Sequence, residues 1–227
     1  MKGKLFTLIS FLMLVSMSCA TVLLDANFES DAVGALPAGW ANNASTGATM
    51  TASTGAMAPW HSSTKSAYIG ITTPGVTYAW YYASLAANTA QDATVSYWVM
   101  YKTTAHTQQV FIAGGGGNLF SQQVDAAGGP GVYIAGPSWT LVTTCTIDTW
   151  YHVKYWIHAG SPGTVDFYWN NMSTPIRTGV SGYAGAAFNV PIDFFEVIAY
   201  NPMYLDDAVI ETGLRFIPIE LLDFKAD

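Results

Sequence analysis

The chain shows almost no helical periodicity, and this feature restricts its fold more than any other. Short stretches rich in Val, Ile, Thr, Tyr, Phe and Trp recur instead, separated by clusters of Gly, Pro, Asn and Ser. Such stretches between turn residues are typical of antiparallel β structure. The sequence therefore predicts an all-β protein.

Eleven strands are predicted, and they are spread over most of the chain. They cover residues 21–28, 66–71, 76–84, 93–103, 108–113, 131–134, 141–146, 150–158, 164–169, 192–200 and 203–211. Segments 42–58 and 114–117 consist mainly of small residues and are predicted to be surface loops. Because so many short strands suit two packed layers, we expect a two-sheet antiparallel jelly-roll sandwich.

The N-terminus has the three-part pattern of a secretory signal peptide. Two lysines precede an apolar run over residues 5–17, and small residues then lead to Ala20. The run is too short to span a bilayer, and no later apolar stretch reaches that length, so no transmembrane segment is expected. We favour cleavage after Ala20, which makes residues 1–20 the signal peptide of a secreted protein. Cleavage before Cys19 would leave a lipid anchor instead, but Ser16 stands where that signal normally has a large apolar residue.

The mature chain is predicted to be one domain over residues 21–214. Its length suits one sizeable β-sandwich, and no proline-rich or charged linker divides it. Residues 215–227 are predicted to be a linker or the start of a following module. Without Cys19, Cys145 is the one remaining cysteine, so no internal disulfide can form. The sequence leaves the oligomeric state open.

The charge balance of the mature chain restricts its partners. Loss of Lys2 and Lys4 from the 8 basic residues leaves 6 against 15 acidic ones, which is a net charge of −9. The arginines are the isolated Arg177 and Arg215. A protein that binds nucleic acid or a strongly anionic polysaccharide would be expected to cluster Lys and Arg, so both partner classes are excluded.

One predicted hairpin carries the candidate ligand site. In residues 150–158 apolar side chains alternate with polar and mixed ones, so the first set is expected in the core and the second outside. Symmetrical pairing about a turn at 160–163 places Trp156 opposite Asp166, Lys154 opposite Tyr168 and His152 opposite Asn170. The apolar face of a sugar stacks on Trp or Tyr while polar groups bond its hydroxyls. We therefore predict that five outward-facing residues bind ligand: Trp156, Tyr168, Asp166, Asn170 and His152.

Other aromatic residues divide between core and second candidates. Core packing accounts for most of the 8 Trp and 13 Tyr residues. The tryptophans predicted to be structural are Trp40, Trp98, Trp150 and Trp169. Second ligand candidates, which lie near loops, are Trp60, His61, Trp80, Tyr81 and Tyr82.

Three pieces of the chain resemble the concanavalin A-like lectin/glucanase superfamily, in particular its laminin-G-like jelly-roll domains. They are Leu-Asp-Ala-Asn-Phe-Glu-Ser at 24–30 leading to Gly39-Trp40, Thr-Trp-Tyr-His-Val at 149–153 with Thr-Val-Asp-Phe-Tyr-Trp-Asn at 164–170, and Tyr-Leu-Asp-Asp-Ala-Val-Ile at 204–210. The first and third also resemble galactose-binding-like jelly rolls of carbohydrate-binding modules. Residues 216–226 resemble a segment that joins such modules to a following domain in proteins exported to the outer surface of Gram-negative cells.

The superfamily resemblance implies a structural calcium ion that joins the first and last strands. The matching acids are Asp25, Glu29 and Asp207, with Asp206 as an alternate. Calcium suits such a set because it takes several oxygen ligands in flexible geometry. The other interpretation is that these acids are solvated at strand ends.

Catalytic residues are harder to find. The superfamily's glucanases carry Glu-x-Asp-x-Glu on one strand, because retaining hydrolysis needs two carboxyl groups close together on one face. No such motif occurs, and the odd spacing of Asp193 and Glu196 sends their side chains to opposite faces of a strand. Jelly-roll lyases need a basic cleft, and none is evident near Arg177 or Arg215. We therefore assign no catalytic residue.

Three functions follow in order of preference. The first is a secreted, non-catalytic carbohydrate-binding module that recognises a neutral polysaccharide or cell-surface glycan by aromatic stacking. The second is a structural or adhesive domain of the cell surface that contacts protein. The third is an enzyme that acts on glycans.

Overall fold

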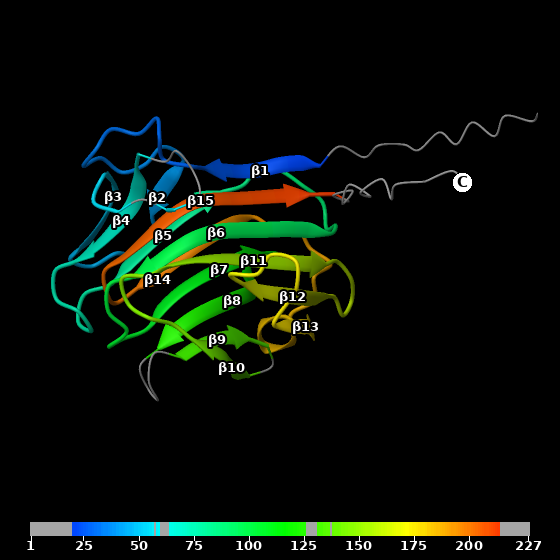
Figure 1. Cartoon of the computed structure of the whole chain (residues 1–227). Coiled ribbons are helices and arrows are strands. Elements are labelled where there is room, and N and C mark those ends of the chain that lie inside the picture. The colour runs from blue at the N-terminus through cyan, green and yellow to red at the C-terminus, as the bar shows by residue number, and fades with distance from the viewer. Residues whose placement is uncertain (1–19, 57, 60–63, 126–130, 137, 214–227) are drawn as a thin grey trace, which may run out of the picture.

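The computed structural model describes residues 20–56, 58–59, 64–125, 131–136 and 138–213. This part of the chain forms two antiparallel β-sheets that pack face to face (Figure 1). Its other regular element is the short 3-10 helix η1 (Tyr183–Gly185). The predicted all-β, two-sheet jelly-roll sandwich is confirmed. Within these residues, no helix has the length and hydropathy needed to cross a membrane.

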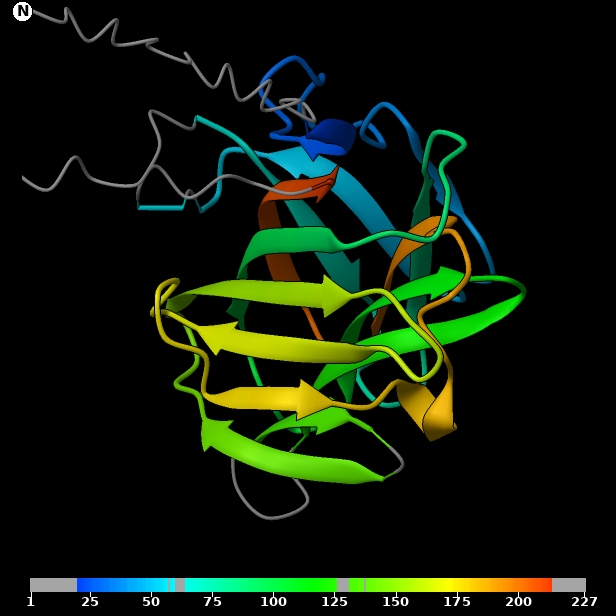
Figure 2. The ribbon, with the colours of Figure 1, turned by 90° about the vertical axis from the view of Figure 1, so that its right-hand side faces the viewer.

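The eight-stranded sheet holds both the first and the last strand. Its order is β13 (Arg177–Val180), β12 (Thr164–Trp169), β11 (Trp150–His158), β6 (Ala93–Tyr101), β15 (Met203–Thr212), β4 (Ser66–Ile71) and β3 (Ala48–Ser53), with β1 (Thr21–Ala26) paired to β15. Figure 1 shows β1, in blue, beside β15, in orange-red. Figure 2 looks onto the part of this sheet formed by β6, β11, β12 and β13.

The seven-stranded sheet forms the other layer. Its order is β10 (Trp139–Thr144), β9 (Gly131–Ala135), β8 (Gly117–Asp125), β7 (Gln108–Gly114), β14 (Phe194–Ala199), β5 (Ala79–Ser84) and β2 (Trp40–Asn42). The edge strands β10 and β13 of the two sheets lie near each other in Figure 2. Gly136, between β9 and β10, is correspondingly close to Val180 of β13.

Alternate residues of the central strands fill the core between the sheets. Along β6, Val95, Tyr97 and Val99 are completely buried, and Phe195 and Val197 of β14 approach from the other sheet. This period of two is what a strand with one buried face produces. Burial of so many large side chains is the main stabilising term for a domain that has one buried free cysteine, Cys145, among its described residues.

Three tyrosine hydroxyls lie inside this core and are bonded to one another or to Gln122. Tyr97 and Tyr101 both donate to Oε1 of Gln122, at 3.2 and 3.0 Å, and the hydroxyls of Tyr97 and Tyr155 share a short bond. Burial raises the pKa of Tyr97 and of Tyr101 well above the ordinary value. A buried polar group without a partner is costly, so this network fixes how β6, β8 and β11 pack.

The structure corrects the strand predictions in several places. Segment 42–58 is not one surface loop, because β3 lies within it and pairs with β4 along its whole length. Four strands were not predicted, namely β2, β3, β8 and β13. The predicted strands β4, β11 and β12 have the observed bounds, whereas the others begin or end a few residues away. The predicted loop at 114–117 is the tight turn between β7 and β8, with positive φ at Gly115 and Gly116.

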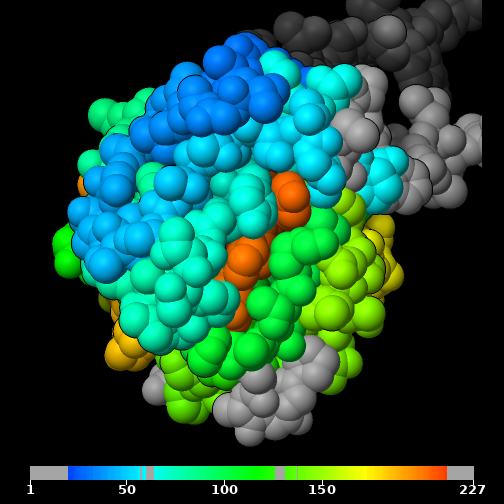
Figure 3. Space-filling model, turned by 90° about the vertical axis from the view of Figure 1, so that its left-hand side faces the viewer, coloured from blue at the N-terminus to red at the C-terminus, as the bar shows by residue number. Residues whose placement is uncertain are grey.

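Loops from both sheets meet at the end of the sandwich that Figure 3 shows. The amide of Gly75 donates to the carbonyl of Tyr200, and the amide of Tyr200 donates to the carbonyl of Thr107. In Figure 3 the orange segment lies recessed between teal and green segments. The rings of Tyr78 and Tyr200 pack at 5.6 Å in this region.

Candidate functional site

The predicted hairpin is present with the predicted register. Trp156 pairs with Asp166, and Lys154 pairs with Tyr168. His152 and Asn170 also meet, because the amide of each donates to an oxygen of the other, at 3.1 and 2.8 Å. Trp156 is 36% exposed. Its neighbour Tyr155 is fully buried, as the alternation predicts.

Most of the five predicted ligand residues already contact their own neighbours. Tyr168 is only 4% exposed, and Nζ of Lys154 lies 3.7 Å from the centre of its ring. Asp166 accepts a hydrogen bond from the amide of Gly179 and contacts His158.

Two more of the predicted residues are engaged in the same way. His152 stacks on Trp98 with ring centres 4.6 Å apart. Asn170 uses Oδ1 to accept the bond from the His152 amide. Trp156 is the most exposed of the predicted aromatic residues, at 36%, and its indole packs against the ring of His158 at 4.8 Å.

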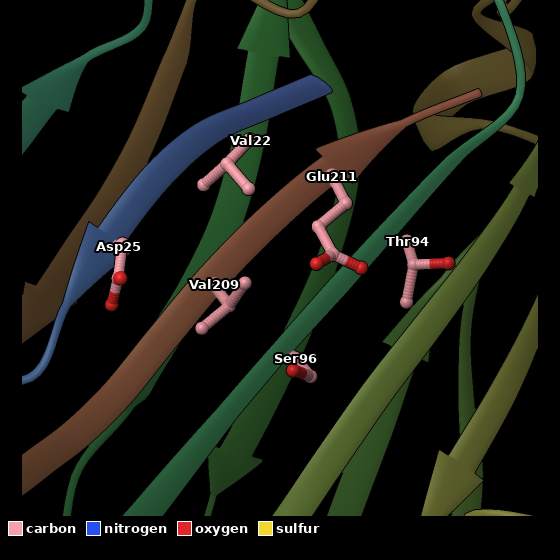
Figure 4. Close-up of a pocket in the computed structure, with 6 residues that line it drawn as sticks. All are labelled: Val22, Asp25, Thr94, Ser96, Val209 and Glu211. Carbon is pink, nitrogen blue, oxygen red and sulfur yellow. The ribbon is translucent and has the colours of Figure 1, made fainter. Parts of the chain in front are cut away.

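A trough of about 310 Å³ lies on this outer face, over β1, β15 and β6. Figure 4 shows its six lining residues, which come from three adjacent strands. They are Val22 and Asp25 of β1, Val209 and Glu211 of β15, and Thr94 and Ser96 of β6. Thr94 is the cross-strand partner of Trp156, so the trough and the predicted aromatic residue are contiguous.

The acids matched to calcium do not meet at one point. Both oxygens of the Glu29 carboxylate accept bonds from Thr64, and Oε1 also accepts one from the amide of Lys65. Asp25 lines the trough, and Asp207 lies at a bulge of β15 with a φ of 44°. In the part of the chain that the structure describes, no three His, Cys, Asp or Glu side chains are grouped so as to hold a metal ion. The geometry does not fit a carboxylate cage, and the calcium site stays a prediction.

A second arrangement of aromatic and polar side chains lies on the outer face of the seven-stranded sheet. One row of cross-strand neighbours crosses five strands and spans about 19 Å at the usual strand spacing. In order, the row is Tyr133, Gln123, Gln109, Ile198 and Trp80. All five side chains are half-buried. The alternate residues of these strands face the core, so the row faces outward.

Hydrogen bonds connect the polar members of this face. Gln109 donates to Gln123 at 2.6 Å, and Gln123 donates to Asp125 at 3.1 Å. Thr107 also donates to Asp125, at 3.2 Å. Such a network holds the amide and carboxylate groups in fixed positions before any ligand arrives.

Glu196 occupies the centre of the next row, between Phe111 of β7 and Tyr82 of β5. Its side chain faces the aromatic surface, and Oε2 accepts a 2.7 Å bond from the indole of Trp80. Burial raises the pKa of the Glu196 carboxyl, and the bond from Trp80 opposes part of that shift. A carboxylate held in this way accepts hydrogen bonds at a fixed point among aromatic rings.

The two carboxylates on this face are far apart. Glu196 and Asp125 are two strands and four residues apart in the register. At about 4.8 Å per strand and 3.3 Å per residue, this places their Cα atoms roughly 16 Å from each other. Glycoside hydrolysis by paired carboxyl groups needs the carboxyl groups themselves to lie within about 9.5 Å of each other, which is much closer than these two backbone positions are. The arrangement suits binding better than cleavage.

Sequence reasoning missed most of this face. Trp80 and Tyr82 were second candidates, but Gln109, Gln123 and Tyr133 were not singled out. No alternation of polar with apolar residues marked them, since 108–113, for example, reads Gln-Gln-Val-Phe-Ile-Ala. Tyr81, another second candidate, is buried in the core, so it does not face a ligand. The remaining ones, Trp60 and His61, lie outside the described residues.

Comparison with known proteins agrees with the fold. No family model and no curated protein matches the sequence. Solved structures with a similar fold include a sialidase, an endo-β-1,4-glucuronan lyase from the fungus Trichoderma reesei and the carbohydrate recognition domain of Emp47p. Their sequence identities to this chain are 9%, 10% and 9%, and their TM-scores are 0.66, 0.55 and 0.53.

The coverage of these matches differs. Each aligns with 85–86% of this chain. The alignment spans 96% of the lyase and 97% of the recognition domain, but 19% of the sialidase chain. The chain thus has the fold of β-sandwich domains found in proteins that bind or act on carbohydrates.

Proposed function

We propose that the protein is a secreted, non-catalytic carbohydrate-binding module that holds a neutral glycan on the outer face of its seven-stranded sheet. The observation that carries this proposal is the row from Tyr133 to Trp80, in which aromatic rings flank hydrogen-bonded glutamines. Sugar rings stack on such aromatic faces, and their hydroxyls pair with amide and carboxylate groups. One of the similar structures is, by its title, a carbohydrate recognition domain.

The charge of this face favours a neutral ligand over a uronate. The four basic residues that the structure describes are Lys65, Lys102, Lys154 and Arg177, and none is on a strand of the seven-stranded sheet. The carboxylates of Asp125 and Glu196 lie there instead. The similar lyase acts on glucuronan, a polyanion, and a chain that bound such a polymer would need cations to balance it.

The second candidate function is a glycan-active enzyme, because two of the similar structures are enzymes. The distance between Glu196 and Asp125 argues against paired-carboxylate hydrolysis. Release of reducing ends from a neutral polysaccharide by the purified protein would support the enzyme and overturn the non-catalytic proposal.

The test of binding is a screen of the purified protein against neutral oligosaccharides such as cellohexaose, xylohexaose, laminarihexaose and mannohexaose, with alginate as the anionic control. Trp80→Ala should reduce the binding free energy of the best ligand by about 1–3 kcal/mol, the usual cost of losing one aromatic stacking contact. Trp80→Phe should retain most of the affinity. Trp150→Ala, on the opposite sheet and in neither proposed site, is the matched control for loss of a half-buried tryptophan. Full binding by Trp80→Ala would contradict this site.

A further inference from the structure

The trough on the eight-stranded sheet results from small side chains between two higher walls. Its floor runs along β6 and β15, where Ser96 pairs with Val209. On the next strand, β11, the partners are large: Lys154 pairs with Ser96, and Trp156 pairs with Thr94. The other wall is β1. The hollow therefore follows from the choice of residues at neighbouring positions on one sheet face.

Bulges in two strands direct side chains into this trough. In β1 the register shifts between Val22 and Leu24, so Val22 and Asp25 both line the trough although they are three residues apart. In a regular strand that spacing would place them on opposite faces. A second bulge in β15, between Asp206 and Val209, lies at the other end of the trough, beside Asp25. Bulges re-aim side chains in this way, often beside binding sites.

The lining offers the groups that sugars require. Thr94 and Ser96 present hydroxyls that donate and accept, while Asp25 and Glu211 accept through carboxylates. Val22 and Val209 add apolar surface. Trp156, 36% exposed, stands beside Thr94 and offers an indole ring for stacking.

The surroundings favour a neutral sugar over an anionic one. None of the lining residues is basic. The nearest ammonium group on β11, that of Lys154, lies over the ring of Tyr168 and donates to the carbonyl of Met172. It is therefore directed toward β12, away from Ser96.

We propose that this trough, together with the indole of Trp156 beside Thr94, is a second binding site for neutral glycan. The two sites lie on opposite outer faces of the sandwich, so one molecule could bind two glycan chains and cross-link them. The inference takes its ligand class from the proposed function, but the two sites share no residue.

The test fills the trough without disturbing the core. Ser96→Tyr places a large side chain on the floor of an outward face, and Thr178→Tyr, on the exposed edge strand β13, is the control. Calorimetric titration with the hexasaccharides named above should give two sites per chain for the unaltered protein. Ser96→Tyr should abolish the trough site and keep the other site, and Trp156→Ala should weaken the trough site roughly 10- to 100-fold. Trp80→Ala should affect the other site.

Each outcome separates the two proposals. One site that is lost in Trp80→Ala and kept in Ser96→Tyr would overturn the trough and leave the proposed function intact. One site that is lost in Ser96→Tyr and kept in Trp80→Ala would overturn the site on the seven-stranded sheet and leave the trough intact. Absence of binding to every hexasaccharide would count against both. Cross-linking has its own readout, since the unaltered protein should aggregate beads coated with the bound glycan and Ser96→Tyr should not.

Discussion

The indole Nε1 of Trp80 donates a 2.7 Å hydrogen bond to Oε2 of Glu196. The two residues come from adjacent strands at diagonal positions, since Trp80 pairs with Ile198 and Glu196 pairs with Tyr82. The bond fixes the plane of the indole and the direction of the carboxylate together. Rigid placement of a stacking ring and an acceptor reduces the entropy that a ligand loses on binding.

Glu196 should make stability depend on pH in a predictable direction. Its pKa in the folded protein is raised above 4.5 by burial. The folded state therefore holds the proton more tightly than the unfolded state, and this contribution to stability is present below about pH 4.5 and lost as the pH rises through the folded-state pKa. Glu196→Gln keeps an oxygen that can accept the hydrogen bond from Trp80, and it removes the loss of stability at higher pH because glutamine does not ionise. Thermal melts at several pH values should show that the melting temperature of the variant increases relative to that of the unaltered protein as the pH rises. If the two melting temperatures changed with pH in parallel, Glu196 would not be the group responsible.

The neighbours Tyr155 and Trp156 should have separate roles. Tyr155 packs against Phe120 and Tyr97 in the core, so Tyr155→Ala should lower the free energy of unfolding by roughly 3–5 kcal/mol. Trp156→Ala removes a ring from the outer face and should cost about 1 kcal/mol or less. Denaturant titration of both variants measures the difference. Equal losses would mean that Trp156 is a structural residue.

Two glycines of the β7–β8 hairpin should respond in opposite ways to alanine. A Cβ at Gly114 would lie 1.9 Å from the carbonyl oxygen of Pro191, so Gly114→Ala must displace backbone and should cost about 3 kcal/mol or more. A Cβ at Gly117 meets no atom within 4 Å. Gly117→Ala should change stability by about 0.5 kcal/mol or less. The comparison is a pair of urea melts, and a mild Gly114→Ala phenotype would show that the hairpin can shift.

Glu29 should stabilise the fold through hydrogen bonds and not through a metal. Its carboxylate accepts three bonds from Thr64 and Lys65. Glu29→Ala should therefore lower the free energy of unfolding by about 1–3 kcal/mol, the usual cost of losing such bonds. The loss should be the same in EDTA and in calcium. A loss that appears only with calcium present would instead support the ligand set Asp25, Glu29 and Asp207.

The hairpin of β11 and β12 could be predicted to the residue because every position obeys one rule. The core-facing side chains Tyr151, Val153, Tyr155 and Ile157 recur at every second position, and the turn is short, so the register follows from the sequence alone. In contrast, β3 consists of Ala, Thr, Met and Ser, and its composition is that of a loop. It forms a strand because β4 offers a partner along six residues, which is tertiary information.

The candidate site was only partly predictable for a related reason. Trp156 and Asp166 belong to consecutive strands, and their pairing follows from local spacing. Trp80 and Gln109 are brought together by β14, a strand from much later in the chain. The spacing of residues in the sequence therefore could not predict that these two side chains lie on the same face. The bulge that turns Asp25 into the trough is likewise a property of the β1–β15 pairing.

That same pairing determines how the domain would respond to mechanical load. Thr21 lies opposite Thr212, so the chain enters and leaves the sandwich at one edge. Tension applied between these two points would peel β1 from β15 one hydrogen bond after another, because the bonds of an antiparallel pair lie across the strands. Bonds that break in succession resist much less force than bonds that must all shear at once. If only one of these two points were tethered, no force would act between β1 and β15. Such a domain would withstand a much larger pulling force than one stretched between both points.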